Sequence, residues 1–245
     1  DQGWGTIDSF PEHANGHFYM STESYDENDN HSHLYDVDAV HNTRHLIGDI
    51  DVGGLEFMVG ADGTALYAYG SDQENRTVVY HRVGGDWVQM DPAQVGKTFV
   101  PITYTPDHQH IYALYSADGG PAKLVREDED GKNPTVLAQY NFDSVGDILW
   151  TALPAQPFAT TEDTGVPQAN YIDPNLPSAK LHRALAKSFP GEFVNFVNYS
   201  EDGKELLFSV YSDRDPGTYY LIDTTTFKVA KLFSSEPWID PAKMS

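Results

Sequence analysis

The chain of 245 residues carries a formal net charge of −22, from 37 acidic and 15 basic residues, and contains no cysteine. This acidic excess repels a phosphate backbone and argues against nucleic-acid binding, while the lack of cysteine excludes disulfides, thiolate metal sites and a cysteine nucleophile. Hydrophobic residues make up 40% of the chain and aromatic residues 13%, which is enough for a packed core rich in strand formers.

The sequence has no apolar run of the ~20 residues that a membrane-spanning helix needs, and its acidic start is unlike a signal peptide. Because the chain starts at Asp1 and not at Met, we expect the protein as made to be longer. The lack of cysteine suits the cytoplasm and the periplasm alike, so the compartment stays open. The acidic surface is typical of a protein that stays soluble in a saline habitat.

Two sequence markers recur about every 45 residues along the chain. The first is a turn before an apolar run, found at Asn15-Gly16, Asp62-Gly63, Asp107-His108 and Asp202-Gly203, with a degenerate copy at 142–147. The second is the end of a third apolar run, found at Leu34-Tyr35-Asp36, Val79-Tyr80-His81, Leu124-Val125-Arg126, Tyr171-Ile172-Asp173 and Leu221-Ile222-Asp223.

Four strands per unit at this period are the signature of β-propeller blades. The sequence therefore predicts an all-β propeller domain over 1–233, whole or partial, with about five four-stranded antiparallel blades. Their expected ranges are 1–47, 48–90, 91–138, 139–175 and 193–233.

Histidine pairs stand at His31-Ser32-His33 and His108-Gln109-His110, a spacing that places both imidazoles on one face of an extended segment. Metal sites use this spacing, and the third ligand would be a carboxylate such as Asp26 or Asp29. Polar strand ends on a propeller rim explain the same pattern. We favour that interpretation, so the sequence assigns no metal ligand.

Residues 26–30 carry side-chain oxygens at alternate positions, as calcium loops do. The segment lacks the glycine expected at the sixth position, where His31 stands, and the glutamate expected at the twelfth, where Val37 stands. A second acidic stretch, 128–131, is typical of a plain turn. The sequence therefore predicts neither a calcium site nor a cofactor site.

Some five-bladed propellers are glycosidases, whose chemistry needs two carboxylates about 5–10 Å apart. Acidic residues are numerous enough that the sequence does not exclude such a pair. Those that the pattern places lie in predicted hairpin tips, which favours a solvating role over catalysis: Asp62, Asp107, Asp128 and Asp202.

The segment 175–191 breaks the strand pattern. Leu181, Leu185 and Phe189 recur every four residues, Ser178 is a candidate N-cap, and Pro190-Gly191 ends the run. This predicts a short amphipathic helix near 178–189, inserted between the fourth and fifth blades, where it would cover a gap in the propeller face.

The fifth unit is the most regular. Its apolar runs at 193–197, 205–211, 218–222 and 228–233 are separated by turn clusters, and Glu201-Asp202-Gly203-Lys204 is a hairpin signal. The tail 234–245 contains two prolines and Trp238, which we expect to pack against another part of the protein. It is typical of an exit segment toward a further domain.

The residues of the last two units resemble a known family. Tyr171-Ile172-Asp173, the helix ending at Pro190-Gly191, the hairpin 200–204, the segment 212–221 and the tail Pro237-Trp238-Ile239-Asp240-Pro241 are similar to the last propeller blades of bacterial prolyl oligopeptidase family serine peptidases. The resemblance covers roughly 139–245. It implies that the propeller is followed by an α/β-hydrolase domain that carries the catalytic Ser, Asp and His. It also implies that further propeller blades precede the five found here.

The resemblance implies a gating role over that hydrolase domain and contacts with peptide substrates, but no catalysis by this chain. A nucleophile elbow G-x-S-x-G is absent, and the segment around Ser200 lacks both glycines. We therefore expect a non-catalytic propeller with no catalytic residue of its own. The alternative is a free-standing, TolB-like propeller that scaffolds protein partners. If the propeller is a fragment, unpaired strand edges of its end blades would favour edge-mediated homo-oligomers.

Overall fold

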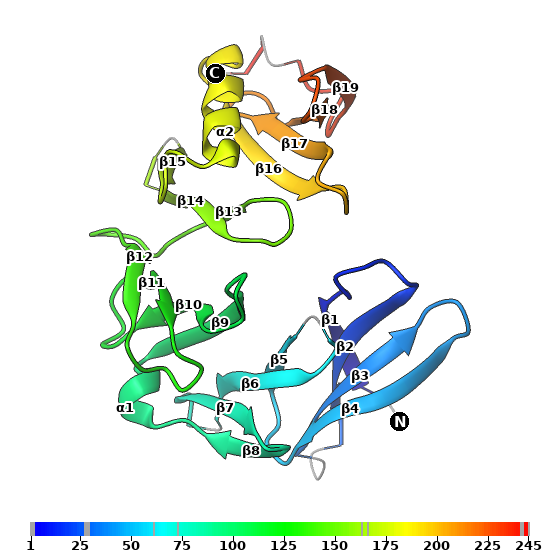
Figure 1. The fold of residues 1–245 in the computed structure, drawn as a ribbon, viewed down its shortest axis with the longest axis vertical. Helices are drawn as coiled ribbons and strands as arrows, with labels where there is room; N and C mark the ends of the chain where they lie inside the picture. Colours follow the sequence, from blue (N-terminus) through cyan, green and yellow to red (C-terminus); the bar gives the residue numbers. More distant parts are fainter. Residues whose placement is uncertain are drawn as a thin grey trace. The chain divides into compact units, whose positions relative to one another are not determined.

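The computed structural model describes residues 3–26, 30–60, 62–72, 74–162, 164–165, 167–240 and 243–244. The chain divides into two compact units, Asp1–Asn141 and Phe142–Ser245, each of which is described separately below. Five antiparallel sheets follow one another along the sequence (Figure 1). The fold class predicted from the repeat, an all-β propeller with five blades, is confirmed.

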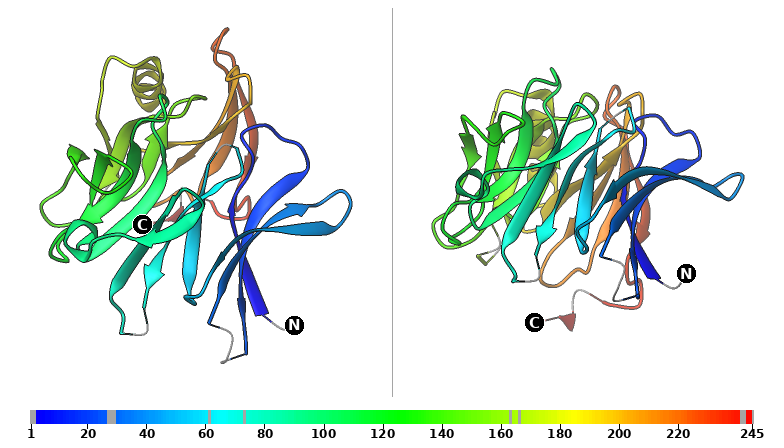
Figure 2. Two further views of the ribbon diagram at one scale, coloured as in Figure 1. Left: turned by 60° about the horizontal axis from the view of Figure 1, so that its bottom comes forward. Right: turned by 90° about the horizontal axis from the view of Figure 1, so that it is seen from below.

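The first blade is a four-stranded meander. It consists of β1 (Gly3–Ser9), β2 (His17–Ser24), β3 (Ser32–Asp38) and β4 (Thr43–Ile50), paired in chain order. Figure 2 shows the strong twist of this sheet, drawn in the darkest blues. Leu34, from the centre of β3, is fully buried and packs with residues of the second blade. One face of the first sheet therefore belongs to the core.

The second and third blades repeat this meander. The second contains β5 (Leu55–Val59), β6 (Ala65–Ser71), β7 (Thr77–Val83) and β8 (Asp86–Gln89), and the third contains β9 (Thr98–Tyr104), β10 (Ile111–Ser116), β11 (Lys123–Glu127) and β12 (Thr135–Ala138). A one-turn helix that the strand repeat did not predict, α1 (Pro92–Val95), joins them. It begins where Asp91 accepts a hydrogen bond from the N–H of Ala93, and Val95 is buried in the core between the two blades.

The predicted turn marker falls at the first hairpin of four blades. Gly16, Gly63, His108 and Gly203 have φ of 84°, 80°, 54° and 68°, the left-handed conformation that tight hairpin turns require. The chain uses glycine at three of these turns. Repeated turn chemistry is therefore the reason that the blades could be counted from the sequence.

The fourth blade has three strands where four were predicted. They are β13 (Ile148–Trp150), β14 (Pro157–Glu162) and β15 (Gln168–Tyr171). The marker at 142–147 precedes the first strand, so the run after it was wrongly interpreted as a second strand. Pro174 and Pro177 follow β15, and neither has a backbone N–H to donate to a fourth strand. The chain instead enters a helix that begins at Pro177.

The inserted helix, α2 (Pro177–Ser188), lies close to the predicted range 178–189. Its buried residues are Ala179, His182 and Leu185, and Leu181 and Phe189 pack against the same cluster, so the expected apolar face is confirmed. Ser178 is not the N-cap. Leu176 holds that position without a side-chain hydrogen bond, and the Ser178 hydroxyl lies 3.3 Å from the Tyr199 hydroxyl instead.

The fifth blade contains β16 (Phe193–Tyr199), β17 (Glu205–Tyr211), β18 (Thr218–Asp223) and β19 (Val229–Ser234). Its core centres on Phe208, which is stacked on Tyr220 at 5.3 Å and meets Phe189 of the α2 C-terminus edge-on at 6.1 Å. Trp238 is 77% exposed, so it does not pack against the described part of this chain. Among the described residues, no helix is long and apolar enough to cross a membrane.

Candidate functional site

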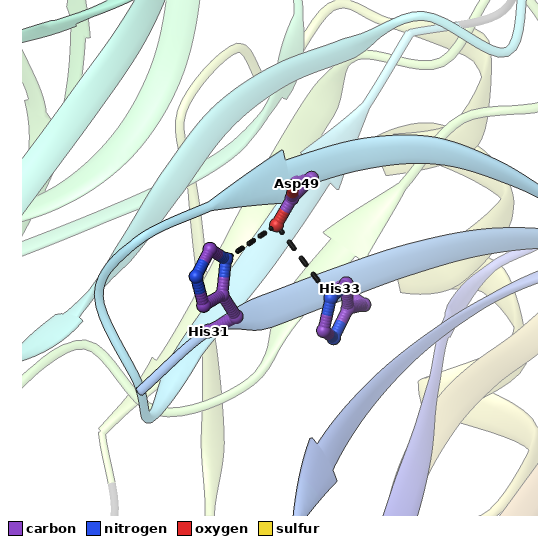
Figure 3. Close-up of side chains that lie close together, drawn as sticks. All are labelled: His31, His33 and Asp49. Atoms are coloured by element: carbon purple, nitrogen blue, oxygen red, sulfur yellow. Dashed lines mark hydrogen bonds and ion pairs between the residues drawn. The ribbon is translucent and has the colours of Figure 1, made fainter. Parts of the chain in front are cut away.

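Two histidines of the first blade converge on one carboxylate. His31 precedes β3, His33 lies within it, and Asp49 on β4 is the cross-strand partner of His33. Asp49 Oδ1 lies 2.8 Å from His31 Nδ1 and 3.6 Å from His33 Nε2 (Figure 3). The two imidazole rings are stacked, with centroids 5.7 Å apart and planes 13° from parallel. The three side chains form the only group in the described part of the chain whose ligand atoms all lie within 4.8 Å of one another.

The backbone under this group is fixed by hydrogen bonds from the core. The hydroxyl of Ser32, a fully buried residue between the two histidines, donates to the Val52 carbonyl at 2.7 Å and accepts from the Leu55 N–H at 3.0 Å. On the neighbouring strand, the Trp87 indole N–H donates to the Asp49 carbonyl at 2.8 Å. Both strands are therefore held in place beneath the three side chains.

The same sheet carries a groove of about 790 Å³. The residues that line it include His33, Tyr35, Arg44 and Trp4. The Arg44 guanidinium lies 4.7 Å from the Tyr35 ring centroid, within the range of a cation–π contact. The histidine group therefore lies beside a partly open, polar and aromatic surface.

Two further histidines of this blade pair with carboxylates. His17 Nδ1 lies 2.7 Å from Asp36 Oδ1, and this hydrogen bond raises the pKa of His17. His41 Nδ1 lies 2.6 Å from Asp38 Oδ2, and hydrogen bonds from His41 hold the pKa of Asp38 at about 2. His17 Nε2 is 3.8 Å from Asp38 Oδ2, but the ligand atoms of these residues do not converge as those of the first group do.

The second histidine pair is not brought together. His108 lies in a turn with φ of 54°, so the segment is not extended there as the spacing argument assumed. His108 stacks on Tyr104, with ring centroids 5.9 Å apart, and His110 Nε2 lies 3.6 Å from Asp128 Oδ1. These contacts place the two imidazoles in separate environments.

The predicted carboxylate partners of His31 and His33 were Asp26 and Asp29. Asp26 is not a member of the converging group, and Asp29, together with most of the calcium-loop candidate 26–30, lies outside the described residues. The structure supplies Asp49 instead. This ligand candidate was missed because its proximity depends on the register between β3 and β4, which the sequence spacing does not contain.

The acidic hairpin residues accept hydrogen bonds within their own turns. Asp62 accepts from the Thr64 N–H, Asp107 from the Thr105 hydroxyl, and Asp202 from the Lys204 N–H. These bonds lower the pKa of Asp62 and Asp107. The pKa of Asp202 is lowered to about 2, first by the hydrogen bond from the Lys204 ammonium at 2.8 Å and then by that from its N–H. Carboxylates that cap turns in this way favour the predicted solvating role over a glycosidase pair, in which one acid has a raised pKa.

Two buried titratable groups were not singled out by the sequence. Glu127 at the end of β11 is 1% exposed, neither of its carboxyl oxygens has a hydrogen-bond partner among the described residues, and burial raises its pKa to about 7. His182 of α2 lies 2.7 Å from both the Tyr171 hydroxyl and the Val194 carbonyl, and burial lowers its pKa. Because the carbonyl only accepts, Nε2–H donates to it and Nδ1 accepts from Tyr171, a satisfied structural role.

Comparison with known proteins supports the fold alone. No family model matches the chain, and no curated protein matches it. Among solved structures, TolB from Acinetobacter baumannii has a TM-score of 0.54 at 14% identity, over 95% of this chain and 55% of that one. A puromycin hydrolase has a TM-score of 0.53 at 13% identity, over 94% of this chain and 37% of the hydrolase.

Prolyl oligopeptidase B from Galerina marginata has a TM-score of 0.51 at 12% identity, over 93% of this chain and 34% of that one. The chain therefore spans from about a third to just over half of the length of these three proteins. Its fold is that of a TolB or prolyl oligopeptidase-type propeller.

Proposed function

We propose that residues 1–245 are the non-catalytic propeller domain of a prolyl oligopeptidase-like serine peptidase. The domain would dock on an α/β-hydrolase domain of the same protein and restrict entry to peptide substrates. The supporting observation is the extent of the likeness: more than nine tenths of this chain aligns with only 37% of the puromycin hydrolase and 34% of the oligopeptidase. The sequence adds that the chain has no nucleophile elbow of its own.

The end of the second unit offers side chains suited to docking. The outer strand β19 presents Leu232 and Phe233 in exposed positions, and Trp238 follows in the tail with 77% of its surface exposed. Large aromatic residues are the common anchors of protein interfaces, because they bury a large apolar area and lose little side-chain entropy. These residues support a contact with a further domain.

The test is to read the frame on both sides of residues 1–245 and to purify the protein that it encodes. We expect that frame to encode an α/β-hydrolase domain with a G-x-S-x-G elbow, whose purified product reacts with a fluorophosphonate probe and hydrolyses peptide amides. The 245-residue chain alone should show neither reaction. A flanking frame without a hydrolase domain, or labelling of the 245-residue chain, would contradict the proposal.

Trp238→Ala should weaken the association of the 245-residue chain with that hydrolase domain, supplied as a separate chain, by about tenfold or more. Its free energy of unfolding should change by less than about 0.5 kcal/mol, because the side chain is exposed. Titration by fluorescence anisotropy and urea unfolding measure the two effects. Phe10→Ala is the matched control. Phe10 is an exposed aromatic residue of the first unit, and this variant should bind like the unchanged chain.

A free-standing propeller that scaffolds protein partners is the second candidate. The similarity to TolB favours it, because that match has the TM-score of 0.54 and covers 55% of the TolB chain, a larger share than in either hydrolase. The same flanking sequence separates the two functions. A reading frame without a hydrolase domain would support the scaffold.

A further inference from the structure

His31, His33 and Asp49 have the composition of a transition-metal site, and we propose that they bind a zinc ion on the edge of the first blade. Imidazole and carboxylate are standard Zn²⁺ ligands, and two imidazoles disfavour Mg²⁺ and Ca²⁺, which prefer an all-oxygen shell. The site consists of other residues than those proposed above for docking, so it stands or fails independently of that function.

The distances suit a zinc ion. Bonds of about 2.0–2.2 Å to nitrogen and oxygen place neighbouring ligand atoms of a tetrahedral site about 3.3–3.6 Å apart. Asp49 Oδ1 lies 2.8 Å from His31 Nδ1 and 3.6 Å from His33 Nε2, and all three ligand atoms lie within 4.8 Å of one another, so the ion would be admitted once the side chains adjust. Zn²⁺ would take the place of the hydrogen bond between His31 and Asp49.

The strand geometry accounts for the convergence. His31, just before β3, and His33, within it, are two residues apart, and Asp49 stands opposite His33 on the next strand, so all three side chains leave the same face of the sheet. Ser32 and Trp87 fix the backbone beneath them through the hydrogen bonds described above. The backbone is therefore held in place before the ion binds.

A second carboxylate is placed to orient one ligand. Asp51 Oδ1 lies 3.5 Å from His31 Nε2, the ring nitrogen that faces away from Asp49. When Nδ1 is bound to a metal, Nε2 carries the proton, and a carboxylate that accepts it fixes the tautomer and makes the imidazole a better ligand. His17 also lies between two carboxylates, with Nδ1 2.7 Å from Asp36 Oδ1 and Nε2 3.8 Å from Asp38 Oδ2, but the described residues around it do not form a converging group of three ligands.

Three protein ligands leave one position of a tetrahedral site open. All three side chains are partly exposed, and His33 also lines the groove of the first sheet. The open position would therefore be filled by water or by a donor group of a molecule bound in that groove. In structural zinc sites, by contrast, all four positions are filled by protein ligands.

The test is isothermal titration of the full 245-residue chain with ZnCl₂, after removal of any affinity tag and of bound metal with EDTA. We expect one saturable zinc site and no comparable uptake of Mg²⁺ or Ca²⁺.

His33→Gln and His31→Gln should each abolish this site, and Asp51→Asn should weaken it by about tenfold. His17→Gln and His110→Gln alter histidines that face carboxylates elsewhere, and both variants should bind zinc like the unchanged chain. Circular dichroism checks that each variant folds. If only one of His31→Gln and His33→Gln folds, that variant alone is compared with the unchanged chain. The proposal is overturned if zinc binding is absent, if it survives in a folded His33→Gln or His31→Gln variant, or if His17→Gln removes it.

Discussion

Phe208→Ala should lower the free energy of unfolding by about 3–5 kcal/mol, the range for truncating a fully buried phenylalanine. Phe208 has no exposed surface, and its ring is held between Tyr220 on the neighbouring strand and Phe189 beyond α2. Removing a ring that is packed on two sides by other residues leaves a cavity, which the surrounding structure closes only in part. The loss therefore includes both the transfer free energy and the cavity.

Urea unfolding followed by circular dichroism measures this change. Hydrogen exchange of peptides from β16 to β18 assigns it to the second unit, whose contacts are largely its own. Phe142→Ala is the matched control: Phe142 is 88% exposed, and its truncation should change stability by less than about 0.5 kcal/mol. Equal effects of the two substitutions would show that the cluster around Phe208 is not the core of this unit.

The strand repeat could be predicted because the same local chemistry recurs in each blade. Gly16, Gly63 and Gly203 take the positive φ that a tight turn needs, and such positions are visible in the sequence. The fourth blade was harder because its turn segment 142–147 stands before the first strand. A period alone does not tell which strand of the blade follows a given turn.

The metal candidate could be predicted only in part from the sequence. The pair His31 and His33 follows from spacing, because side chains two residues apart leave a strand on the same face. Asp49 does not follow, because β3 and β4 shift their register between Leu34 and Tyr35. One residue of shift sends every side chain of a strand to the other face, so the third ligand requires the structure.

Glu127 should make the stability of the chain depend strongly on pH. Its position in β11 opposite the fully buried Ile111 puts the side chain in the core, although glutamate is a residue that sequence reasoning places at the surface. Neither carboxyl oxygen has a hydrogen-bond partner, and the nearby charges of Asp128 and Asp130 add to the effect of burial. The folded chain therefore keeps this carboxyl protonated up to a pKa of about 7, against a usual value of 4.5.

The sign of the pH dependence follows from linkage. Well below pH 4.5 the carboxyl is protonated in both states, and its ionisation does not contribute to the pH dependence of stability. Between pH 4.5 and 7 the unfolded chain releases the proton and the folded chain keeps it, so the contribution of Glu127 to stability falls as pH rises. Above pH 7 the penalty is complete, at roughly 2–3 kcal/mol.

Glu127→Gln should remove this penalty, because the amide stays neutral at every pH. The variant should be more stable than the unchanged chain by roughly 2–3 kcal/mol at pH 8, and this difference should shrink toward zero near pH 4.5. Urea unfolding across that range measures it, and Glu12→Gln, at an exposed position, corrects for the other titrating groups. A difference that stays constant between pH 4.5 and 8 would mean that Glu127 is ionised in the folded chain, and its orphaned oxygens would then require a bound cation.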